Sequence, residues 1–303
     1  KSKKRKYREI YRGHTMIQSN CKLNIGLNIL NKRKDGYHEL DMVMVPIDFS
    51  DIIEYRDYNI EGDLILETNH GNIPTDEKNT VRKAYNLYFD NANISKKKIK
   101  IFLEKIVPHE AGLGGGSSNA AFVLKELNKK YEIYDDIELE KIAVRVGADV
   151  PFFLKNKSAR VMGIGEKIEE IENNLTTNVL LIKPSDVGMS TGRVYSYYEN
   201  HKSDLKMANI DEIINGMREN DITHLEKHIE NSLEQLIFKK DNRLKDIKNK
   251  IEDSLSKKVF LSGSGSCFFA FYDKDNRDIK KLDKKNVYYR LIRKPFLCRR
   301  KVL

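Results

Sequence analysis

The sequence predicts an α+β fold in two domains. Segments with strand-like and helix-like periodicity follow one another without the even alternation of a doubly wound parallel sheet. The pattern is interrupted around residues 169–178, and a new apolar run begins at Val179. With 303 residues, the chain is long enough for two domains that each bury a core.

The composition is that of a globular protein, with 40% hydrophobic and 33% charged residues. No stretch approaches the ~18 consecutive apolar residues of a membrane span, and no apolar signal-peptide core follows the basic N-terminus. The three cysteines, Cys21, Cys267 and Cys298, form no CxxC pair, and their odd number suits a reducing compartment. We therefore expect a cytoplasmic protein that has no membrane partner.

The net charge of +10 is concentrated at the chain ends. Lys1–Arg12 holds seven basic residues and one acidic residue, and Arg293–Leu303 holds five basic residues and no acidic one. Such ends suit either a nucleic-acid tail or a solvated extension. The RNA-recognition consensus, zinc ligands and basic-zipper heptads are all missing, so we do not expect a nucleic-acid partner. We expect a disordered or artificially added extension over residues 1–15, an N-terminal domain over 16–175, and a C-terminal domain with a basic tail over 176–303.

The first elements are two strands joined by a turn. Ile17–Leu30 alternates in part, and Leu23, Ile25, Leu27 and Ile29 are predicted to share one strand face. An Asp-Gly turn follows at residues 35–36. Another strand is predicted from about residue 42.

The next elements alternate between helix and strand. The pattern predicts a helix over Asn79–Ala92 and a strand over Lys98–Ile106. Helical periodicity returns between Ala120 and Tyr131, where Leu124 and Leu127 lie on the same face. A second helix follows, with Leu139, Ile142, Ala143 and Val146 directed inward and Gly147 ending it.

The second half opens on a strand over Val179–Ser185. Long charged helices are predicted from about Asp211 to Ser254. A strand over Lys258–Tyr272 is interrupted by a second small glycine- and serine-rich loop.

A glycine-rich loop lies between a predicted strand and a predicted helix. Its glycines are Gly112, Gly114, Gly115 and Gly116. Bare backbone lets consecutive N–H groups approach an anion, and the helix N-terminus adds unpaired N–H groups and a positive dipole end. Ser117 and Ser118 can cap the helix or turn a hydroxyl toward phosphate or Mg²⁺. The loop matches neither G-x-x-x-x-G-K-[ST] nor G-x-G-x-x-G, so a flexible turn is the alternative. The neighbouring strand and helix favour an anion site.

The segment "GLGGGSSNAA" (Gly112–Ala121) closely resembles the phosphate loop of the GHMP kinases. "CKLNIGLNILNKRKDGYHEL" (Cys21–Leu40) and "VGADVPFFL" (Val146–Leu154) resemble two motifs of the subfamily that phosphorylates 4-diphosphocytidyl-2-C-methylerythritol. "LSGSGSCFFA" (Leu261–Ala270) resembles the glycine loop of the family's C-terminal domain. The resemblance extends from about residue 16 to about residue 272. It implies the two-domain GHMP kinase fold, with the active site in the cleft between the domains.

The resemblance implies ATP-dependent phosphorylation of the 2-hydroxyl of 4-diphosphocytidyl-2-C-methylerythritol, a step of non-mevalonate isoprenoid synthesis. ATP would bring Mg²⁺ with it, and the partner would be a small molecule carrying a cytidine diphosphate group. The chain is expected to be a monomer or homodimer. The alternatives are another GHMP kinase of the homoserine or mevalonate type, or a nucleic-acid-binding protein that uses the basic ends.

The resemblance also assigns roles to single residues. Asp149 is the candidate base, and Lys22 is its partner. Asn24 lies two residues from Lys22 and would therefore face the same side of the strand. The implied nucleotide-binding residues are Asn79, Lys105, Gly112, Gly114, Gly115, Gly116, Ser117 and Ser118. The implied substrate-binding residues are Asn24, Tyr37, His38, Thr191, Tyr195, Gly263, Ser264 and Gly265. In this reading Tyr37 and Tyr195 sandwich the cytosine.

No metal site on protein ligands is expected. His224 and His228 are four residues apart, but the segment is highly charged and is not HExxH. We interpret this pair as part of a solvated helix face.

Overall fold

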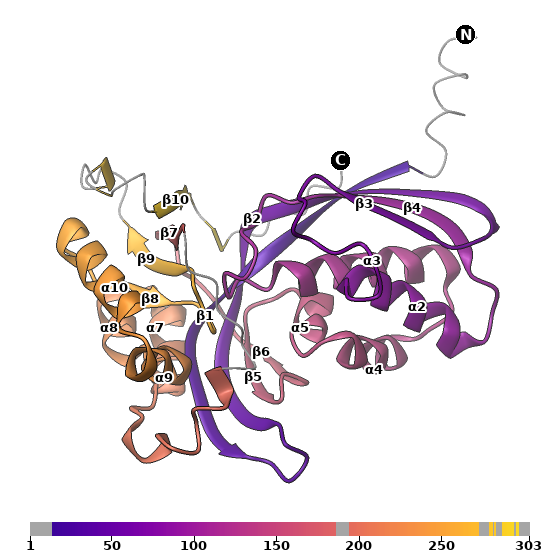
Figure 1. Cartoon of the computed structure of the whole chain (residues 1–303). Helices are drawn as coiled ribbons and strands as arrows, with labels where there is room; N and C mark the ends of the chain where they lie inside the picture. Colours follow the sequence, from indigo (N-terminus) through magenta and orange to yellow (C-terminus); the bar gives the residue numbers. More distant parts are fainter. Residues whose placement is uncertain are drawn as a thin grey trace.

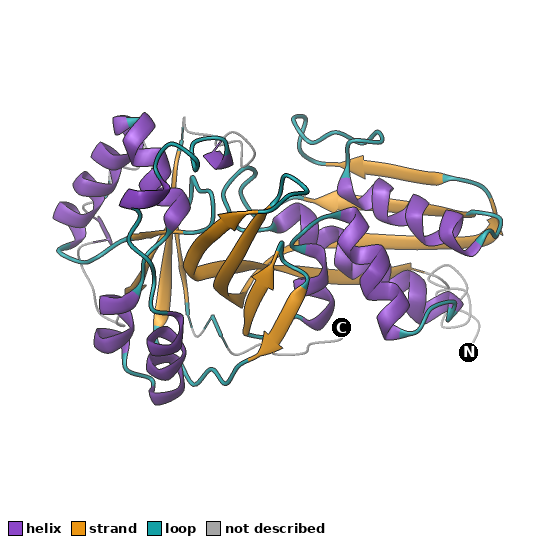
Figure 2. Ribbon diagram, turned by 90° about the horizontal axis from the view of Figure 1, so that it is seen from below, coloured by secondary structure: helices purple, strands orange, loops and turns teal. Residues whose placement is uncertain are grey.

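The computed structural model of the chain describes residues 14–185, 194–272, 279–280, 282, 287–293 and 295–296. Two sheets, each accompanied by its own helices, build the molecule (Figure 1). Figure 2 shows the two groups of helices at opposite ends, with the strands between and beside them. The predicted α+β class is therefore confirmed.

The first sheet has six strands in the order β3-β4-β2-β5-β6, and β1 pairs with β2 outside this path. Only β3 and β4 pair in parallel among these described strands. The strands are β1 (His14–Lys32), β2 (His38–Glu61), β3 (Leu64–Thr68), β4 (Lys97–Glu104), β5 (Ala159–Gly163) and β6 (Lys167–Glu170). The turn between β1 and β2 contains Gly36 at φ +88°, which confirms the turn predicted there.

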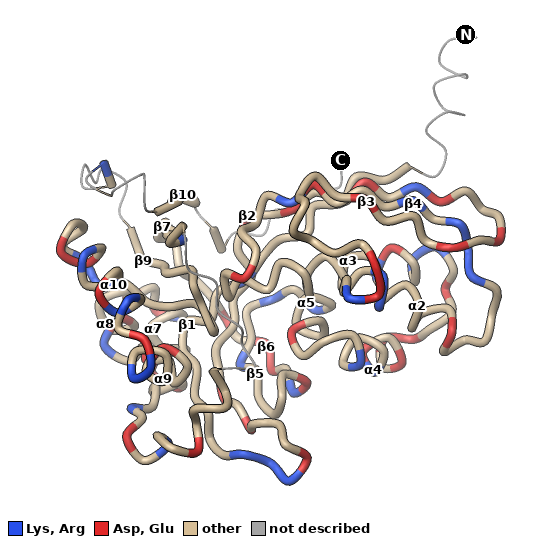
Figure 3. The backbone as a smooth tube through the Cα atoms, viewed as in Figure 1, with Lys and Arg blue, Asp and Glu red and all other residues tan. Residues whose placement is uncertain are grey.

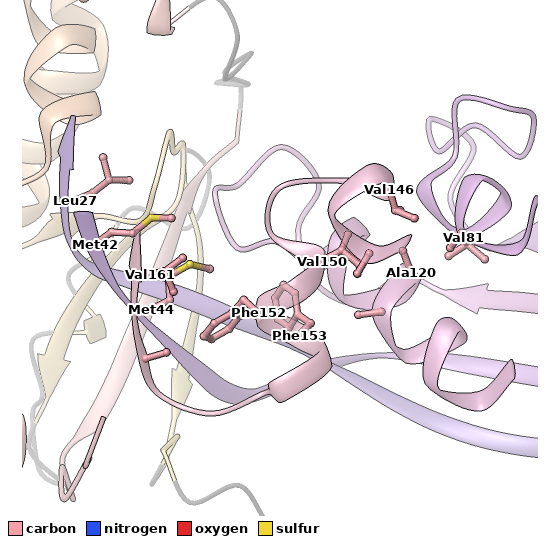
Figure 4. Packing of buried hydrophobic residues seen from close by; sticks show 14 of the residues in the cluster. Leu27, Met42, Met44, Val81, Ala120, Val146, Val150, Phe152, Phe153 and Val161 are labelled. Atoms are coloured by element: carbon pink, nitrogen blue, oxygen red, sulfur yellow. The ribbon is translucent and has the colours of Figure 1, made fainter. Parts of the chain in front are cut away.

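The helices of the first half are α2 (Thr80–Ala92), α3 (Gly115–Tyr131), α4 (Asp136–Val146) and α5 (Val150–Lys155). Asp135 and Glu138 form a capping box at the start of α4, and Gly147 caps its end, as predicted. The short helix α5 is anchored by Phe152 and Phe153, both fully buried. Figure 4 shows these two rings beside Met44 and Val161.

The second sheet is antiparallel, in the order β10-β7-β9-β8. Its strands are β7 (Asn178–Pro184), β8 (Phe260–Leu261), β9 (Phe268–Tyr272) and β10 (Val287–Ile292). Its helices are η1 (Lys202–Asp204), α7 (Ile210–Glu219), α8 (Ile222–His228), α9 (Ser232–Lys240) and α10 (Asn242–Leu255). The charged helical region predicted over 211–254 thus consists of four separate helices. Asn209, Asp221, Asn231 and Asp241 cap their N-termini.

The long hairpin of β1 and β2 contacts both halves of the molecule. Leu27 donates its backbone N–H to Glu230, and Tyr198 Oη donates to the carbonyl of Leu30. On β2, Val43 and Val45 pack in one cluster with Leu181 and Phe269 of the second sheet. The hairpin is therefore shared between the two sheets.

The prediction of one apolar face along β1 is wrong. Leu23 and Ile25 belong to one buried cluster, whereas Leu27 and Ile29 belong to the other. Asn24 pairs with Met44 but Gly26 pairs with Val43, so β1 contains one extra residue at this point. A bulge of this kind moves the following side chains to the opposite face.

Charged residues of both signs are dispersed over the described part of the molecule (Figure 3). A run of basic residues, 32–34, lies at the tip of the β1–β2 hairpin. In the described ranges, none of the helices combines the length and the apolar character that a membrane span requires.

Candidate active site

A cavity of about 1020 Å³ is lined by β1, the hairpin tip, both glycine loops and the start of α5. The lining includes these residues predicted from the sequence: Lys22, Asn24, Tyr37, His38, Asn79, Lys105, Gly112, Gly114, Gly115, Gly116, Ser117, Asp149, Tyr195, Gly263, Ser264 and Gly265. Ser118 does not line it, and Thr191 lies outside the described residues. Lys32, Lys78, Thr80 and Glu199 also line the cavity, although the sequence reasoning did not identify them.

The helix after the first glycine loop begins earlier than its periodicity predicts. Gly114 is the N-cap of α3, with φ +69° and no side-chain cap. Ser117 and Ser118 consequently lie within the first turns, so the prediction that they cap the helix is wrong. Ser118 is fully buried, and its hydroxyl donates to the carbonyl of Asn20 at 2.6 Å. Only the Ser117 side chain of this pair faces the cavity.

The two glycine loops are hydrogen-bonded to each other. Ser266 and Cys267 donate backbone N–H groups to the carbonyls of Glu110 and Ala111, at 3.2 and 3.1 Å. A Cβ atom on Gly112 would lie 1.9 Å from the carbonyl oxygen of Ser262, so no side chain fits there. The loops therefore form one continuous wall of the cavity.

His109 and Glu110 lie at the start of the first glycine loop. Their side chains are about half exposed, and His109 Nε2 lies 3.7 Å from a Glu110 carboxylate oxygen. Glu110 has φ +49°. The backbone carbonyl of Glu110 accepts a hydrogen bond from the second loop.

Lys22 lies where three segments meet. Its buried ammonium donates to the carbonyl of Gly112 at 2.9 Å and to Oδ1 of Asn24. A carboxylate oxygen of Asp149 is 3.8 Å away. Burial lowers the pKa of Lys22, and the negative charge of Asp149 partly offsets this change. The predicted placement of Lys22 and Asn24 on one side of β1 agrees with this contact.

Asp149 is held at the N-cap of α5 and keeps its side chain about one-third exposed to the cavity. The next residue, Val150, is fully buried and donates its backbone N–H to Gly147. Gly165 packs against the peptide group that precedes Asp149. A Cβ added to Gly165 would lie only 2.6 Å from the carbonyl oxygen of Ala148. This support fixes the position of a carboxylate that has no hydrogen bond to its own helix end.

Lys105 is paired with Asp51, a residue that the sequence reasoning missed. The Lys105 ammonium contacts an Asp51 carboxylate oxygen and donates to Oδ1 of Asn119 at 2.9 Å. The other Asp51 oxygen accepts the backbone N–H groups of Ile106 and Val107, at 2.7 and 2.8 Å. Asp51 is fully buried. It therefore positions the lysine beside the phosphate loop, where a Cβ on Gly115 would lie 3.4 Å from Nζ.

We expect the replacement of Asp51 by alanine to destabilise the fold. The Lys105 ammonium would lose its carboxylate partner, and breaking such a buried pair costs about 3–5 kcal/mol. Urea unfolding measures the loss directly. Glu67→Ala, which removes the exposed partner of Lys100, should cost less than about 1 kcal/mol. Equal losses in the two variants would refute this role of Asp51.

His38 and Tyr195 stack on each other at the far end of the cavity. Their ring centroids are 4.9 Å apart, and Tyr198 packs edge-on against His38 at 5.2 Å. Burial, followed by the charge of Lys32, lowers the pKa of His38, so its ring is neutral at pH 7. Among the residues that the structure describes, the buried His38 Nε2 has no hydrogen-bond partner. Tyr37 is 60% exposed, whereas Tyr195 stacks on His38. The sandwich of cytosine between the two tyrosines stays a prediction.

The Asn79 side chain forms hydrogen bonds with backbone groups at the edge of the cavity. Its side chain accepts the N–H of Val81 at the start of α2 and donates to the carbonyl of Pro74 at 2.6 Å. The neighbouring Thr80 hydroxyl donates to the carbonyl of Gly116 at 2.9 Å. Together these bonds hold the loop before α2 against the phosphate loop.

Proteins of known family resemble this chain over most of its length. Residues 79–157 match the model of the GHMP kinases N terminal domain. The 4-diphosphocytidyl-2-C-methyl-D-erythritol kinase of Fusobacterium nucleatum is 49% identical over 257 residues, which are 84% of this chain and 87% of the relative. The enzyme of that name from Clostridium beijerinckii is 37% identical, over 85% of this chain and 90% of the relative.

Solved structures give the same result. A crystal structure of 4-(cytidine 5'-diphospho)-2C-methyl-D-erythritol kinase superposes with a TM-score of 0.73 at 27% identity, covering 92% of this chain and 99% of that one. The homoserine kinase of Cytophaga hutchinsonii, at 16% identity and a TM-score of 0.70, shares the fold. The fold and the glycine-lined cavity define the GHMP kinase class. Within that class, the chain belongs to the family of the 4-diphosphocytidyl-2-C-methyl-D-erythritol kinases.

Proposed function

We propose that this chain transfers the γ-phosphoryl group of ATP to the 2-hydroxyl of 4-diphosphocytidyl-2-C-methyl-D-erythritol. The observation that carries the proposal is the Lys22–Asp149 pair, 3.8 Å apart, in a cavity lined by the glycine-rich N-terminus of α3. A kinase needs this combination of a phosphate cradle and a charged pair where the acceptor hydroxyl binds. The family membership points to the same reaction and places it in isoprenoid synthesis.

In this proposal, the phosphates of ATP lie against Gly112 and Gly114–Gly116. The backbone of Gly114 has the positive φ that opens the N-terminus of α3, and this glycine N-cap makes no side-chain bond to the first N–H groups of the helix. Lys105 adds a positive charge beside the loop. Mg²⁺ would enter with ATP and neutralise charge on the phosphates. Ser117 and Asp149 line the same cavity and would offer it oxygen ligands.

Asp149 would accept the proton of the acceptor hydroxyl, or orient it, as phosphoryl transfer proceeds. Lys22 would stabilise the negative charge that develops between the hydroxyl and the transferred group. Asn24 would contact the acceptor hydroxyl as well, because its amide oxygen accepts a hydrogen bond from the Lys22 ammonium. The same oxygen lies close to the second glycine loop, since a Cβ added to Gly263 would be 3.0 Å from it. Gly263, Ser264 and Gly265 would close the acceptor side of the cavity.

The cytosine would bind at the end formed by Tyr37, His38 and Tyr195. A neutral histidine offers one donor and one acceptor, which suits a base edge that carries both an amine and acceptors. His38 Nε2, which bonds to none of the described residues, would supply one of these groups. Burial and the charge of Asp149 raise the pKa of Tyr195, so its hydroxyl remains protonated. Lys32, at the same end, would face the diphosphate.

We expect the uridine analogue of the substrate to react much more poorly. Uracil replaces the exocyclic amine of cytosine with a carbonyl, so a site built for cytosine would leave groups unpaired, at about 1–3 kcal/mol each. Comparing kcat/KM for the two substrates measures this loss. Equal kcat/KM values would show that the cytosine assignment is wrong, whether or not the kinase assignment holds.

A coupled assay of ADP release tests the reaction itself. We expect release with the cytidyl substrate and only background release with homoserine or mevalonate. Rapid turnover of either smaller alcohol, without turnover of the cytidyl substrate, would overturn the proposed acceptor.

We also propose a domain boundary near residue 175, supported by the gap between the end of β6 at Glu170 and the start of β7 at Asn178. The buried free thiols of Cys21 and Cys267 support the proposed cytoplasmic location. Whether the chain is a monomer or a homodimer stays a prediction from the sequence.

A further inference from the structure

The α7–α8 hairpin brings three metal-ligating side chains together outside the cavity. Glu212, His224 and His228 each offer one ligand atom, and these atoms lie within 4.8 Å of one another. His224 Nε2 is 2.7 Å from a Glu212 carboxylate oxygen, and the two imidazole centroids are 4.8 Å apart. None of the three residues lines the candidate active site.

The backbone around these residues is fixed by close helix packing. A Cβ on Gly216 would lie 2.9 Å from Cβ of Leu225, so glycine allows α7 and α8 to approach closely. Asn209, the N-cap of α7, donates its backbone N–H to the carbonyl of His228 at 3.2 Å. This bond ties the first turn of α7, which carries Glu212, to the last turn of α8. The scaffold thus holds the ligands near their places before any ion binds.

The chemistry of the cluster selects a particular class of ion. Two imidazoles and one carboxylate are ligands for Zn²⁺ and its neighbours, whereas Mg²⁺ and Ca²⁺ prefer oxygen-only sets. Within the described residues, no hydrogen bond to the His228 ring competes with a metal. His228 is also the last residue of α8, where the helix dipole favours a positive charge.

We propose that Glu212, His224 and His228 bind one divalent transition-metal ion of the Zn²⁺ class. The sequence alone predicts only a solvent-facing histidine pair. The third ligand, Glu212, lies 12 residues before His224, and the folded chain brings the two together. Each of the ligands is partly exposed, so water would complete the coordination. The site would be structural and separate from phosphoryl transfer.

The position of the hairpin indicates what the ion would stabilise. Ala208, just before α7, exchanges two hydrogen bonds with the Asn28 side chain of β1, at 2.8 and 2.9 Å. Ile213 packs directly on the backbone of β1, 2.6 Å from a Cβ position on Gly26. An ion that joins α7 to α8 would therefore stabilise the packing of this helix pair on β1, the strand that carries Lys22.

Titration of the full, untagged chain with Co²⁺ or Zn²⁺ in the absence of nucleotide tests the proposal. We expect one ion per chain, an imidazole-type Co²⁺ spectrum, and a Tm that rises with Zn²⁺. In Glu212→Gln and His228→Ala, affinity should fall by about 10–100-fold or more. His70→Ala, at an exposed histidine outside the cluster, is the matched control and should bind like the parent chain.

Measurement of Tm in EDTA establishes that each variant folds, and either variant alone suffices for the comparison. Parent-like metal affinity in a folded Glu212→Gln or His228→Ala protein would overturn the proposal. So would a parent chain that shows no saturable binding of either ion. Kinase activity should be the same in the parent and both variants, because the three residues lie outside the cavity.

Discussion

Replacement of Asp149 by asparagine is expected to lower kcat by roughly 10²–10⁴, the usual contribution of a positioned proton acceptor. The substitution keeps the size of the side chain and part of its hydrogen bonding but removes the basic oxygen. KM should change less than kcat, because the nucleotide and cytosine ends of the cavity are built from other residues. Steady-state kinetics with saturating ATP separate the two effects.

Lys22→Met should also lower kcat, because the ammonium that contacts Asp149, Asn24 and Gly112 is lost. Since Lys22 and Asp149 act on the same charge, the double variant should be little slower than the slower single variant. Asp136→Asn, at an exposed position on α4, is the matched control and should keep parental kcat. If Asp149 only orients the hydroxyl in a loose transition state, the loss would be about tenfold or less. Near-parental kcat in Asp149→Ala would exclude both roles.

Replacement of Gly114 by valine is expected to weaken ATP binding by about tenfold or more, which corresponds to about 1.4 kcal/mol. Gly114 has φ +69°, and a non-glycine residue in this region costs about 1–2 kcal/mol even without a clash. A Cβ there would also lie 3.0 Å from the Phe153 ring and 3.2 Å from Cε of Lys22. The same change would therefore also displace the Lys22 side chain. Calorimetric titration with ATP measures the loss in affinity.

Gly115→Val tests the phosphate cradle with less strain. Gly115 has no positive φ, and its Cβ would meet Val107 at 3.3 Å and Lys105 Nζ at 3.4 Å. ATP affinity should fall here while the free energy of unfolding changes less than in Gly114→Val. Gly71→Val, where the added Cβ would meet no atom within 4 Å, is the control. Unchanged ATP affinity in both loop variants would remove the loop from nucleotide binding.

The fold was predictable where the signal is local. The inward apolar face of α4 and its stop at Gly147 depend on neighbouring residues, and both agree with α4 as observed. The extra residue at Ile25 was not predictable, because a bulge depends on how β2 pairs with β1. Likewise, the sequence did not place the start of α3 at Gly114, because glycines and serines at the start of a helix show no apolar periodicity.

The candidate site was predictable where a motif names a residue, as for Lys22 and Asp149. Asp51 carries no such signal: it is one acidic residue on a long strand, 54 residues from Lys105. Asp51 is important because it is buried and because its carboxylate accepts hydrogen bonds from four groups. The aromatic end shows the same limit of sequence reasoning. Tyr195 and His38 were both named, but their direct stacking is a contact between residues 157 positions apart, which no local sequence pattern specifies.

The shared β1–β2 hairpin also has a consequence for the order in which the protein is made. A ribosome releases β1 about 180 residues before the Ala208 segment that bonds Asn28. During that interval the part of β1 around Leu27 and Ile29 lacks the residues of α9 and of the second sheet that share its buried cluster in the folded protein. The N-terminal half therefore cannot finish folding on its own as it emerges. Completion must await the C-terminal half, so nascent chains stalled between the two halves should be prominent targets for chaperones and proteases.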